Sequence, residues 1–306
     1  MRILSLRLSW QPFSRITWWP SPTTPRRARP WACEHHAPWT HPTGLQAATT
    51  EPAQSVSPGQ DTRSKGAAMP TLGIIGSGNI GAAVARLAAA AGIDVVISNS
   101  RGPQSLTGLV EELGPRATAG TVEQAASAGE ATLLSIPLTA YRSLPAGLLR
   151  GRTVLDTGNY YPHRDGRIPE LDSEKLTTTE LAQQLLPGAL LVKAFNSILA
   201  HHIPQLARPA GAPDRSALPI AGNDPGAKAQ AAKLIDHLGF DTVDAGTLGE
   251  SWRFEPESGA YTRIYLADPD VPAERMLQSP AAPLTTDKLR RALEASQRVK
   301  VAERTF

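Results

Sequence analysis

The sequence has almost no cysteine and no long apolar run. Its single cysteine, Cys33, excludes an intramolecular disulfide framework and a zinc site built from several cysteines. No stretch of eighteen or more apolar residues occurs among the 306, so the sequence predicts no transmembrane helix. Apolar residues make up 41% of the chain, which is enough for a sizeable core. We expect a cytoplasmic protein with no membrane partner.

Acidic residues are scarce in the first 68 residues, which hold three of them against eight Lys or Arg. The remainder of the chain is slightly acidic, so the sequence pI of about 9.1 reflects this first segment. The folded body therefore has no electrostatic reason to bind nucleic acid. The segment also contains nine of the 27 prolines and five of the six tryptophans, without helical or strand periodicity.

We interpret residues 1–68 as a disordered basic extension rich in Pro and Trp. A transit peptide, or a basic arm that binds RNA or a membrane, are the alternatives, because the segment is rich in Arg and poor in acids. Met69 stands directly before the first orderly strand. We therefore expect the functional protein to start at Met69, which leaves 238 residues.

A glycine-rich turn connects the first predicted strand, residues 71–75, to a helical pattern and then to a second strand, residues 93–98. The turn reads Gly76-Ser77-Gly78-Asn79-Ile80-Gly81. Gly76 permits the tight turn, Gly78 lets a pyrophosphate approach the backbone, and Gly81 lets helix and strand pack closely. The helix N-terminus would face the phosphates with free N–H groups. This unit predicts a dinucleotide site.

The end of the second predicted strand carries no acid, although an NAD site usually has Asp or Glu there to bind the ribose. The nearest acid, Asp94, lies at the start of that strand. Ser100 and Arg101 offer instead a hydroxyl and a guanidinium, which suit a 2′-phosphate. We therefore expect NADP(H) as cofactor, and the alternative for Arg101 is a solvated surface side chain.

The chain continues in the alternating pattern of a doubly wound sheet. The pattern predicts helices at 104–113, 121–129 and 138–149 and strands at 117–119, 131–136 and 153–156. Ligands of such sheets lie at the carboxyl ends of the strands. Ile136 and Pro137 should therefore border the nicotinamide, and Asn159 should belong to the next loop of the pocket. We expect a Rossmann-type NADP-binding domain over residues 69–162.

Residues 163–306 are predicted to form a smaller C-terminal α/β region that closes the cleft on the substrate side. We expect strands at 190–195, 218–222 and 240–244, a helix at 224–239, loops over 252–284, and a terminal helix at about 286–303. Asp224 and the proline after it are typical of a helix start. The terminal helix should carry ion pairs between Asp287 and Arg291 and between Glu294 and Arg298.

The sequence contains no Ser/His/Asp or Cys/His constellation, so the catalytic residues stay unknown. Direct hydride transfer needs few side chains, since the protein must align two rings and exclude water. We place Lys193 and Asn196 near the substrate because they follow a strand toward its carboxyl end; the alternatives are a surface lysine and a helix cap. His201 and His202 are adjacent and should point apart, so we expect no metal site.

Four stretches together resemble the NADPH:coenzyme F420 oxidoreductase-like family. These are Gly76–Gly81, Asn99–Pro103, Asp156–Pro162 and Lys193–Asn196. The resemblance covers roughly residues 70–250 and implies a Rossmann domain with a smaller domain closing over it. It implies hydride transfer between NADP and a second planar cofactor, the 8-hydroxy-5-deazaflavin F420. Residues 76–81 would then hold the pyrophosphate, and Ser100 and Arg101 the 2′-phosphate.

The sequence leaves several functional alternatives open. The acceptor could be F420, a flavin or another small molecule, and the direction of the reaction is not determined. A sensor that binds NADPH without turnover is the second reading, since no acid/base pair stands out. A homodimer is left open.

Overall fold

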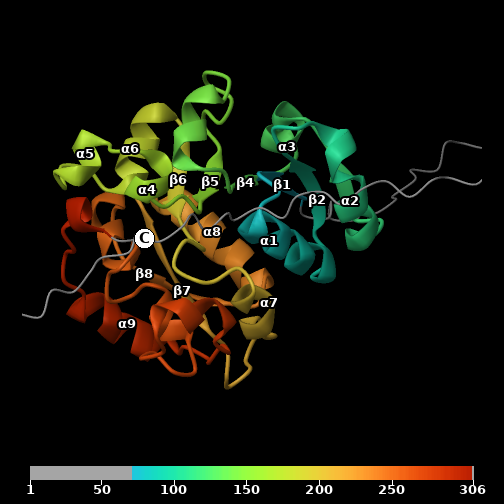
Figure 1. Cartoon of the computed structure of the whole chain (residues 1–306). Coiled ribbons are helices and arrows are strands. Elements are labelled where there is room, and N and C mark those ends of the chain that lie inside the picture. Colours follow the sequence, from blue (N-terminus) through green and yellow to red (C-terminus); the bar gives the residue numbers. More distant parts are fainter. Residues whose placement is uncertain (1–70, 305–306) are drawn as a thin grey trace, which may run out of the picture. The chain divides into compact units, whose positions relative to one another are not determined.

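The computed structural model describes residues 71–304, and the predicted extension 1–68 lies outside them. Eight strands of this part form one sheet in the order β3-β2-β1-β4-β5-β6-β7-β8 (Figure 1). The strands are β1 Thr71–Ile75, β2 Asp94–Ser98, β3 Ala117–Ala119, β4 Ala131–Leu134, β5 Thr153–Asp156, β6 Leu190–Lys193, β7 Ala217–Gly222 and β8 Asp241–Asp244. The predicted α/β fold with a Rossmann-type sheet is confirmed.

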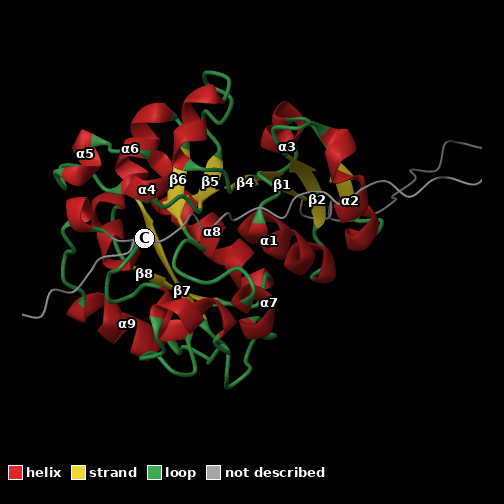
Figure 2. Ribbon diagram, in the orientation of Figure 1, coloured by secondary structure: helices red, strands yellow, loops and turns green. Residues whose placement is uncertain are grey.

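Helices and short 3₁₀ turns alternate with these strands (Figure 2). The α-helices of the described part are α1 Asn79–Ala90, α2 Thr107–Leu113, α3 Val122–Ser127, α4 Pro162–Asp165, α5 Pro169–Asp172, α6 Thr178–Leu185, α7 His202–Leu206, α8 Pro225–His237 and α9 Thr286–Ala295. The 3₁₀ helices are η1 Pro103–Leu106, η2 Leu138–Ser143, η3 Leu248–Phe254, η4 Thr262–Tyr265, η5 Ala273–Gln278 and η6 Val301–Glu303. Within residues 71–304 no helix has the length and apolar character needed to cross a membrane.

The sheet changes direction of winding at β1, which lies between β2 and β4. From β1 to β6 every neighbouring pair is parallel. All carboxyl ends of these six strands therefore meet at one edge of the sheet, and the gap between β1 and β4 is the position where such sheets bind ligands.

Successive side chains of each strand bury themselves in two different cores. Ile74 and Leu133 belong to the core that also contains α1, α7 and α8 residues, whereas the next residues along, Ile75 and Leu134, belong to the core with α3 and α6. Figure 1 shows these two sets of helices on opposite faces of the sheet. Burial on both faces explains why the strands read as continuous apolar runs.

Local capping interactions fix several helix starts. The Thr121 hydroxyl caps α3 and the Thr177 hydroxyl caps α6. In each case the side chain three positions on accepts a hydrogen bond from the N–H of the threonine. Asp224 caps α8 as predicted, since its Oδ1 accepts from the N–H of Ala227 at 2.7 Å.

The joint between β6 and β7 is short and antiparallel. Only two residue pairs form it, Val192 with Gly222 and Lys193 with Ala221. The first four residues of β7 therefore extend past the carboxyl end of β6, and β8 follows them in parallel. The β7–β8 pair thus stands beside the carboxyl edge of the sheet instead of simply extending it.

Several predicted elements end earlier in the structure. The strand expected at 131–136 stops at Leu134. The helix expected at 138–149 is only the 3₁₀ turn η2, because Pro145 and a positive φ at Gly147 end it. The strand expected to reach residue 195 stops at Lys193, since Phe195 has a φ of 59°. The helix expected at 286–303 ends at Ala295.

The prediction of two ion pairs on the terminal helix was also wrong. Asp287 pairs with Arg290 at 3.0 Å, one residue earlier than expected. Because the helix ends before Arg298, that side chain bonds Glu174 instead of Glu294.

Candidate functional site

The loop after β1 contains three glycines with three different surroundings. Gly76 has a φ of 109°, and a Cβ there would lie 2.1 Å from the carbonyl oxygen of Ser135. A Cβ on Gly81 would lie 1.9 Å from the carbonyl oxygen of Gly76. A Cβ on Gly78 would meet nothing within 4 Å. The protein itself therefore requires Gly76 and Gly81, whereas Gly78 keeps open a space that protein atoms do not fill.

That open space lies at the N-terminus of α1. Gly78 is the N-cap and gives no side-chain hydrogen bond, and the first turn of the helix has no acid. The first-turn N–H groups and the positive end of the helix dipole therefore have no anionic partner from the helix itself. Ser77 and Ile80 are half-buried at this turn and Asn79 is exposed. The residues present fit a bound pyrophosphate.

The turn after β2 presents two exposed polar side chains, Ser100 and Arg101. The backbone N–H of Arg101 donates to Asn99 Oδ1 at 2.9 Å. The Asn99 amide also donates to the hydroxyls of Ser77 and Ser105, at 3.2 and 2.9 Å. Asn99 therefore ties this turn to the glycine loop, while within residues 71–304 the Arg101 guanidinium has no hydrogen bond or ion pair.

The one acid of β2 lies at the opposite end of the strand. Asp94 forms an ion pair with Arg116 at 3.0 Å. Asp94 therefore cannot reach a ribose at the carboxyl edge, as the sequence indicated. The cation available at this turn is Arg101, which fits a 2′-phosphate better than a free 2′-hydroxyl.

The residues after β4 lie directly beside the glycine loop. The N–H of Ser135 donates to the carbonyl oxygen of Ile75 at 2.8 Å. A Cβ on Gly76 would lie 2.9 Å from a methyl group of Ile136. Ile136 is half-buried and Pro137 is exposed. Both stand at the switch point between β1 and β4, where the sequence placed them.

The ends of β5 and β6 are joined by two asparagines. Asn159 Nδ2 donates to the carbonyl oxygen of Asn196 at 2.8 Å, and Asn196 Nδ2 donates to Asn159 Oδ1 at 3.2 Å. Asn196 Nδ2 also donates to the carbonyl oxygen of Phe254 at 2.8 Å. The structure thus brings together two of the predicted pocket residues, and both are buried.

Lys193 is completely buried at the end of β6, so the surface reading is excluded. Its ammonium donates to the carbonyl oxygen of Gly158 and lies 3.9 Å from Glu255. Arg304, near the end of the described chain, reaches the other oxygen of Glu255 at 3.3 Å. Lys193 therefore has partners inside the protein, and contact with a substrate stays a prediction.

Glu255 is held as a carboxylate by this arrangement. Burial alone would raise its pKa, but Lys193, Arg304 and the N–H of Thr178 outweigh burial and hold the pKa of Glu255 below its usual value. The N–H of Thr178 donates to its Oε1 at 2.8 Å. Two cations and one anion thus lie in the interior beside the ends of β5 and β6.

A second buried carboxylate, Asp156 at the end of β5, supports the same edge. It accepts hydrogen bonds from the Tyr141 hydroxyl, from the N–H of Gly158 at 2.9 Å and from the Thr179 hydroxyl at 3.0 Å. Burial, followed by the charge of Asp156, raises the pKa of Tyr141 well above its usual value. The pair fixes the start of the loop that carries Asn159.

The sequence places Tyr161 in the loop of the pocket, but it does not indicate that Tyr261 contacts it at this edge. Tyr161 and Tyr261 bring their hydroxyl oxygens to 2.6 Å from each other. Asn159 Nδ2 lies 3.2 Å from the first and 3.4 Å from the second. The Asn-Tyr-Tyr run after β5 includes Tyr161, but no pattern connects it to a residue 100 positions later.

The adjacent histidines do not point apart as expected. Their rings lie 4.2 Å apart between centroids, because His201 precedes and His202 begins the short helix α7. His202 is buried and its Nε2 bonds the carbonyl oxygen of Ser279 at 2.8 Å. Among the described residues no group of three or more His, Cys, Asp or Glu could hold a metal.

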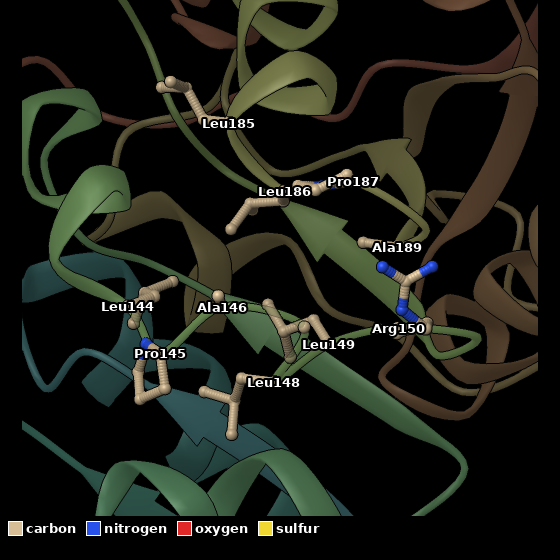
Figure 3. Close-up of a pocket in the computed structure, with 11 residues that line it drawn as sticks. Leu144, Pro145, Ala146, Leu148, Leu149, Arg150, Leu185, Leu186, Pro187 and Ala189 are labelled. Atoms are coloured by element: carbon tan, nitrogen blue, oxygen red, sulfur yellow. The ribbon is translucent and has the colours of Figure 1, made fainter.

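Two hollows lie away from the carboxyl edge. The pocket in Figure 3, about 20 Å³, is lined by apolar residues between η2 and α6, with Arg150 as its charged side chain. It has room for about one water. A groove of about 680 Å³ lies beside β8, at the edge of the sheet opposite β3. Neither adjoins the glycine loop.

Residues 71–160 match the profile of the family described as NADP oxidoreductase, coenzyme F420-dependent. A hypothetical protein of Sinorhizobium meliloti, of known crystal structure, is 34% identical over 60% of this chain and 88% of that one, with a TM-score of 0.52. The chain belongs to this family of NADP-dependent oxidoreductases.

Another solved structure, from Arthrobacter sp., is described as an F420-dependent NADP reductase. It is 25% identical over 59% of this chain and 86% of that one, with a TM-score of 0.48. No curated protein matches the chain. Membership of the oxidoreductase family favours an enzyme over the sensor, and the cofactor is NADP(H).

Proposed function

We propose that this oxidoreductase passes a hydride between NADPH and a second planar acceptor at the carboxyl ends of β4, β5 and β6. The deazaflavin coenzyme F420 is the first candidate, because the matched family and the Arthrobacter protein carry that description. The observation that carries the proposal is the empty volume over Gly78 beside the uncapped start of α1. No steric requirement of the fold explains a glycine there.

The proposed cofactor contacts follow from the loop geometry. Backbone N–H groups of residues 76–81, Gly76-Ser77-Gly78-Asn79-Ile80-Gly81, would hold the pyrophosphate. Ser100 and Arg101 would bind the 2′-phosphate at the end of β2. With the adenosine half fixed on the β2 side, the nicotinamide half must extend the other way, over β4 and β5. Ile136 and Pro137 would then border the nicotinamide ring.

The acceptor side is proposed to involve Asn159, Lys193 and Asn196. When bound, NADPH supplies a hydride at its nicotinamide ring. The chain must hold the acceptor parallel to that ring and exclude water. Asn159 and Asn196 hold each other, and Lys193 holds the Gly158 carbonyl. We propose that these three residues keep the loop after β5 rigid against the acceptor.

The domain boundary at residue 162 is part of the proposal, with residues 69–162 binding NADP and 163–306 on the substrate side. The single sheet runs across this boundary, since β6 pairs directly with β5. A homodimer and a cytoplasmic location also stay predictions.

Two measurements test the proposed function. Calorimetric titration should show NADPH binding more tightly than NADH. Nicotinamide absorbance should then fall on addition of a deazaflavin, with a flavin and a cyclic imine as the comparison acceptors. Reduction of the flavin or the imine without the deazaflavin would refute F420 as the acceptor. Tight NADPH binding without turnover of any acceptor would favour the sensor.

A further inference from the structure

Two tyrosine hydroxyls meet at the carboxyl edge of the sheet although their residues lie 100 positions apart. Tyr161 follows β5 and Tyr261 precedes η4. Their oxygens are 2.6 Å apart, and the amide of Asn159 lies within hydrogen-bonding distance of both. Both side chains are half-buried, so the pair stands between the interior and the open side of the loop.

The backbone around the pair is held in unusual conformations. Thr262, next to Tyr261, has a φ of 39°, and Phe195 at the end of β6 has a φ of 59°. The N–H of Thr262 donates to the carbonyl oxygen of Ser197 at 2.8 Å, which fixes the Tyr261 loop to the end of β6. Non-glycine residues in the left-handed region cost free energy and concentrate at functional sites.

The pair lies on the nicotinamide side of the proposed cofactor site. The 2′-phosphate site is at β2 and the pyrophosphate site at β1, so the nicotinamide half extends over β4 and β5. Neighbouring strands are about 4.8 Å apart. Asn159 is the third residue after β5. A hydroxyl bonded to Asn159 is therefore placed at the ring-bearing end of the site.

Within the described residues, the groups around the two tyrosines include hydrogen-bond donors to the Tyr161 hydroxyl but no acceptor for its proton. Asn159 Nδ2 can only donate. Burial raises the pKa of Tyr261 well above its usual value, Tyr161 raises it further, and a hydrogen bond with the Thr262 hydroxyl lowers it. Tyr261 therefore stays protonated and can donate to Tyr161. In that arrangement the Tyr161 hydroxyl proton has no acceptor among the described residues.

The charged groups near the pair come from two segments. Arg164 places its guanidinium 4.7 Å from the centre of the Tyr161 ring and donates to the carbonyl oxygen of Asn159. Asp165 accepts from the N–H of Tyr161 at 3.0 Å and pairs with Arg164. Arg304 acts on Tyr261 from the C-terminal segment. Arg304 is itself paired with Glu255, so each of the two cations near the tyrosines has a carboxylate partner.

Hydride transfer to a neutral acceptor requires a proton as well. The hydride brings two electrons and one proton, so the acceptor gains a negative charge and must take up a second proton. We propose that Tyr161 donates this proton and that Tyr261 and Asn159 position it. The Tyr161 O–H bond breaks, the proton joins a heteroatom of the acceptor, and the tyrosinate recovers a proton from Tyr261, which is replenished by water. This inference rests on the proposed hydride transfer.

The decisive experiment compares two kinds of acceptor in the full chain. A neutral acceptor such as a deazaflavin, a flavin or a quinone needs the proton. A cationic N-methylpyridinium-type acceptor does not, because the hydride already neutralises it. Tyr161→Phe should lower kcat with the neutral acceptors by roughly 100-fold, the lower range for general acids. Its kcat with the cationic acceptor, after subtraction of the reaction without enzyme, should stay within about twofold of the wild type.

Tyr160→Phe is the matched control. Tyr160 neighbours Tyr161, but its hydroxyl bonds Asp172 at 2.8 Å and the N–H of Ile168 at 3.0 Å. It should retain wild-type kcat with every acceptor. NADPH dissociation constants should be equal in all variants, which separates loss of the proton donor from loss of the cofactor site.

Tyr261→Phe tests the positioning role through the pH profile. Without its hydroxyl, the tyrosinate form of Tyr161 loses a hydrogen bond, so the pH above which kcat falls should move upward. A merely structural loss would lower kcat equally at every pH.

Every outcome is decisive. Equal losses with neutral and cationic acceptors, or no loss with any neutral acceptor, overturn the inference. A wild type that reduces no neutral acceptor overturns it as well. If the wild type reduces the flavin or the quinone but not the deazaflavin, only F420 is refuted as the acceptor. The ratio of kcat between Tyr161→Phe and the wild type is then measured with the flavin or the quinone.

Discussion

The two halves of the carboxyl edge are built in opposite ways. At the ends of β1 and β2, Gly78, Ser100 and Arg101 are exposed, and within residues 71–304 the Arg101 guanidinium has no polar partner. At the ends of β5 and β6, Asn159, Lys193 and Asn196 are buried and bonded to one another or to nearby backbone.

This difference indicates that the two halves have different roles, one in binding the cofactor and the other in supporting the fold. Open N–H groups and a free cation can take an anion without breaking protein contacts, which suits a cofactor that enters and leaves. Buried groups that already form hydrogen bonds cannot bind strongly without losing those bonds. Of the polar atoms of these three side chains, Asn196 Oδ1 has no hydrogen-bond partner among the described residues. These buried side chains instead fix the conformation of the loops after β5 and β6. We therefore expect substitutions in the first half to alter cofactor affinity and substitutions in the second half to alter stability.

The largest expected effect is on protein stability, through the buried residues at the ends of β5 and β6. Lys193→Met leaves Glu255 with Arg304 but without its second cation, and removes the donor to the Gly158 carbonyl. The free energy of unfolding should fall by about 3 kcal/mol, with NADPH affinity little changed in the folded fraction. Denaturant unfolding measures this. Lys228→Met, which breaks a partly exposed pair with Asp244, is the control and should cost about 1 kcal/mol or less.

Gly78→Val should act mainly on cofactor binding. Gly78 has an extended backbone, with φ of −70° and ψ of −172°, which valine adopts readily, and nothing lies near its Cβ. Stability should fall by only about 1 kcal/mol, because valine is a poorer N-cap than glycine, whereas NADPH affinity should fall by more than roughly 100-fold, since the side chain fills the pyrophosphate space. Gly81→Ala, which would contact the Gly76 carbonyl, should destabilise the fold instead. Unchanged NADPH binding by Gly78→Val would refute the phosphate site.

Arg101→Ala sharpens the comparison by separating the two nicotinamide cofactors. Loss of a charge-assisted contact should weaken NADPH binding roughly 10- to 100-fold and leave NADH nearly unaffected. Added salt should narrow the difference between the cofactors in the wild type, because Arg101 is exposed. Arg116→Ala, at the other end of β2, should change neither affinity. Equal losses for NADPH and NADH by titration would show that Arg101 does not read the 2′-phosphate.

The smallest expected effect is on the wild-type protein and appears only in acid. The pKa of Glu255 is below its usual value of 4.5, so its stabilisation is present above that pH and is lost as the pH falls through the lowered value. The melting temperature of the wild type should therefore drop in acid. Glu255→Gln should be less stable at neutral pH and show a shallower acid drop. Parallel pH profiles for the two proteins would contradict this.

The site at the ends of β1 and β2 could be predicted from the sequence, whereas the contacts at the ends of β5 and β6 could not. The glycine loop, the missing acid after β2 and the Ser100-Arg101 pair are local patterns whose chemistry is fixed by neighbours in the chain. Lys193 was placed at the right edge, but its partner Glu255 is 62 positions away in a region predicted as loops. The contact between Tyr161 and Tyr261 depends on a loop that only tertiary structure brings to β6.

The two errors in predicted helices have different origins. The helix expected at 138–149 has helix-forming residues, yet the chain turns at Pro145 and Gly147. The terminal helix ends at Ala295, and Arg298 then bonds Glu174, more than 100 residues earlier. Pro145 and Gly147 lie inside the first segment, so its helix is ended by local residues. Arg298 instead finds its partner far outside the terminal segment, which propensity and periodicity do not describe.

The two-residue joint between β6 and β7 leaves the sheet with few backbone hydrogen bonds at that seam. Helix α8 packs across it, contacting β5, β6, β7 and β8, and its inward face consists of Ala227, Ala231 and Ile235. Cohesion across the seam is therefore carried by side-chain packing. In hydrogen-exchange terms, amides of β1 to β5 and those of β7 and β8 should open as two cooperative units, with the small residues of α8 setting how tightly the units are coupled.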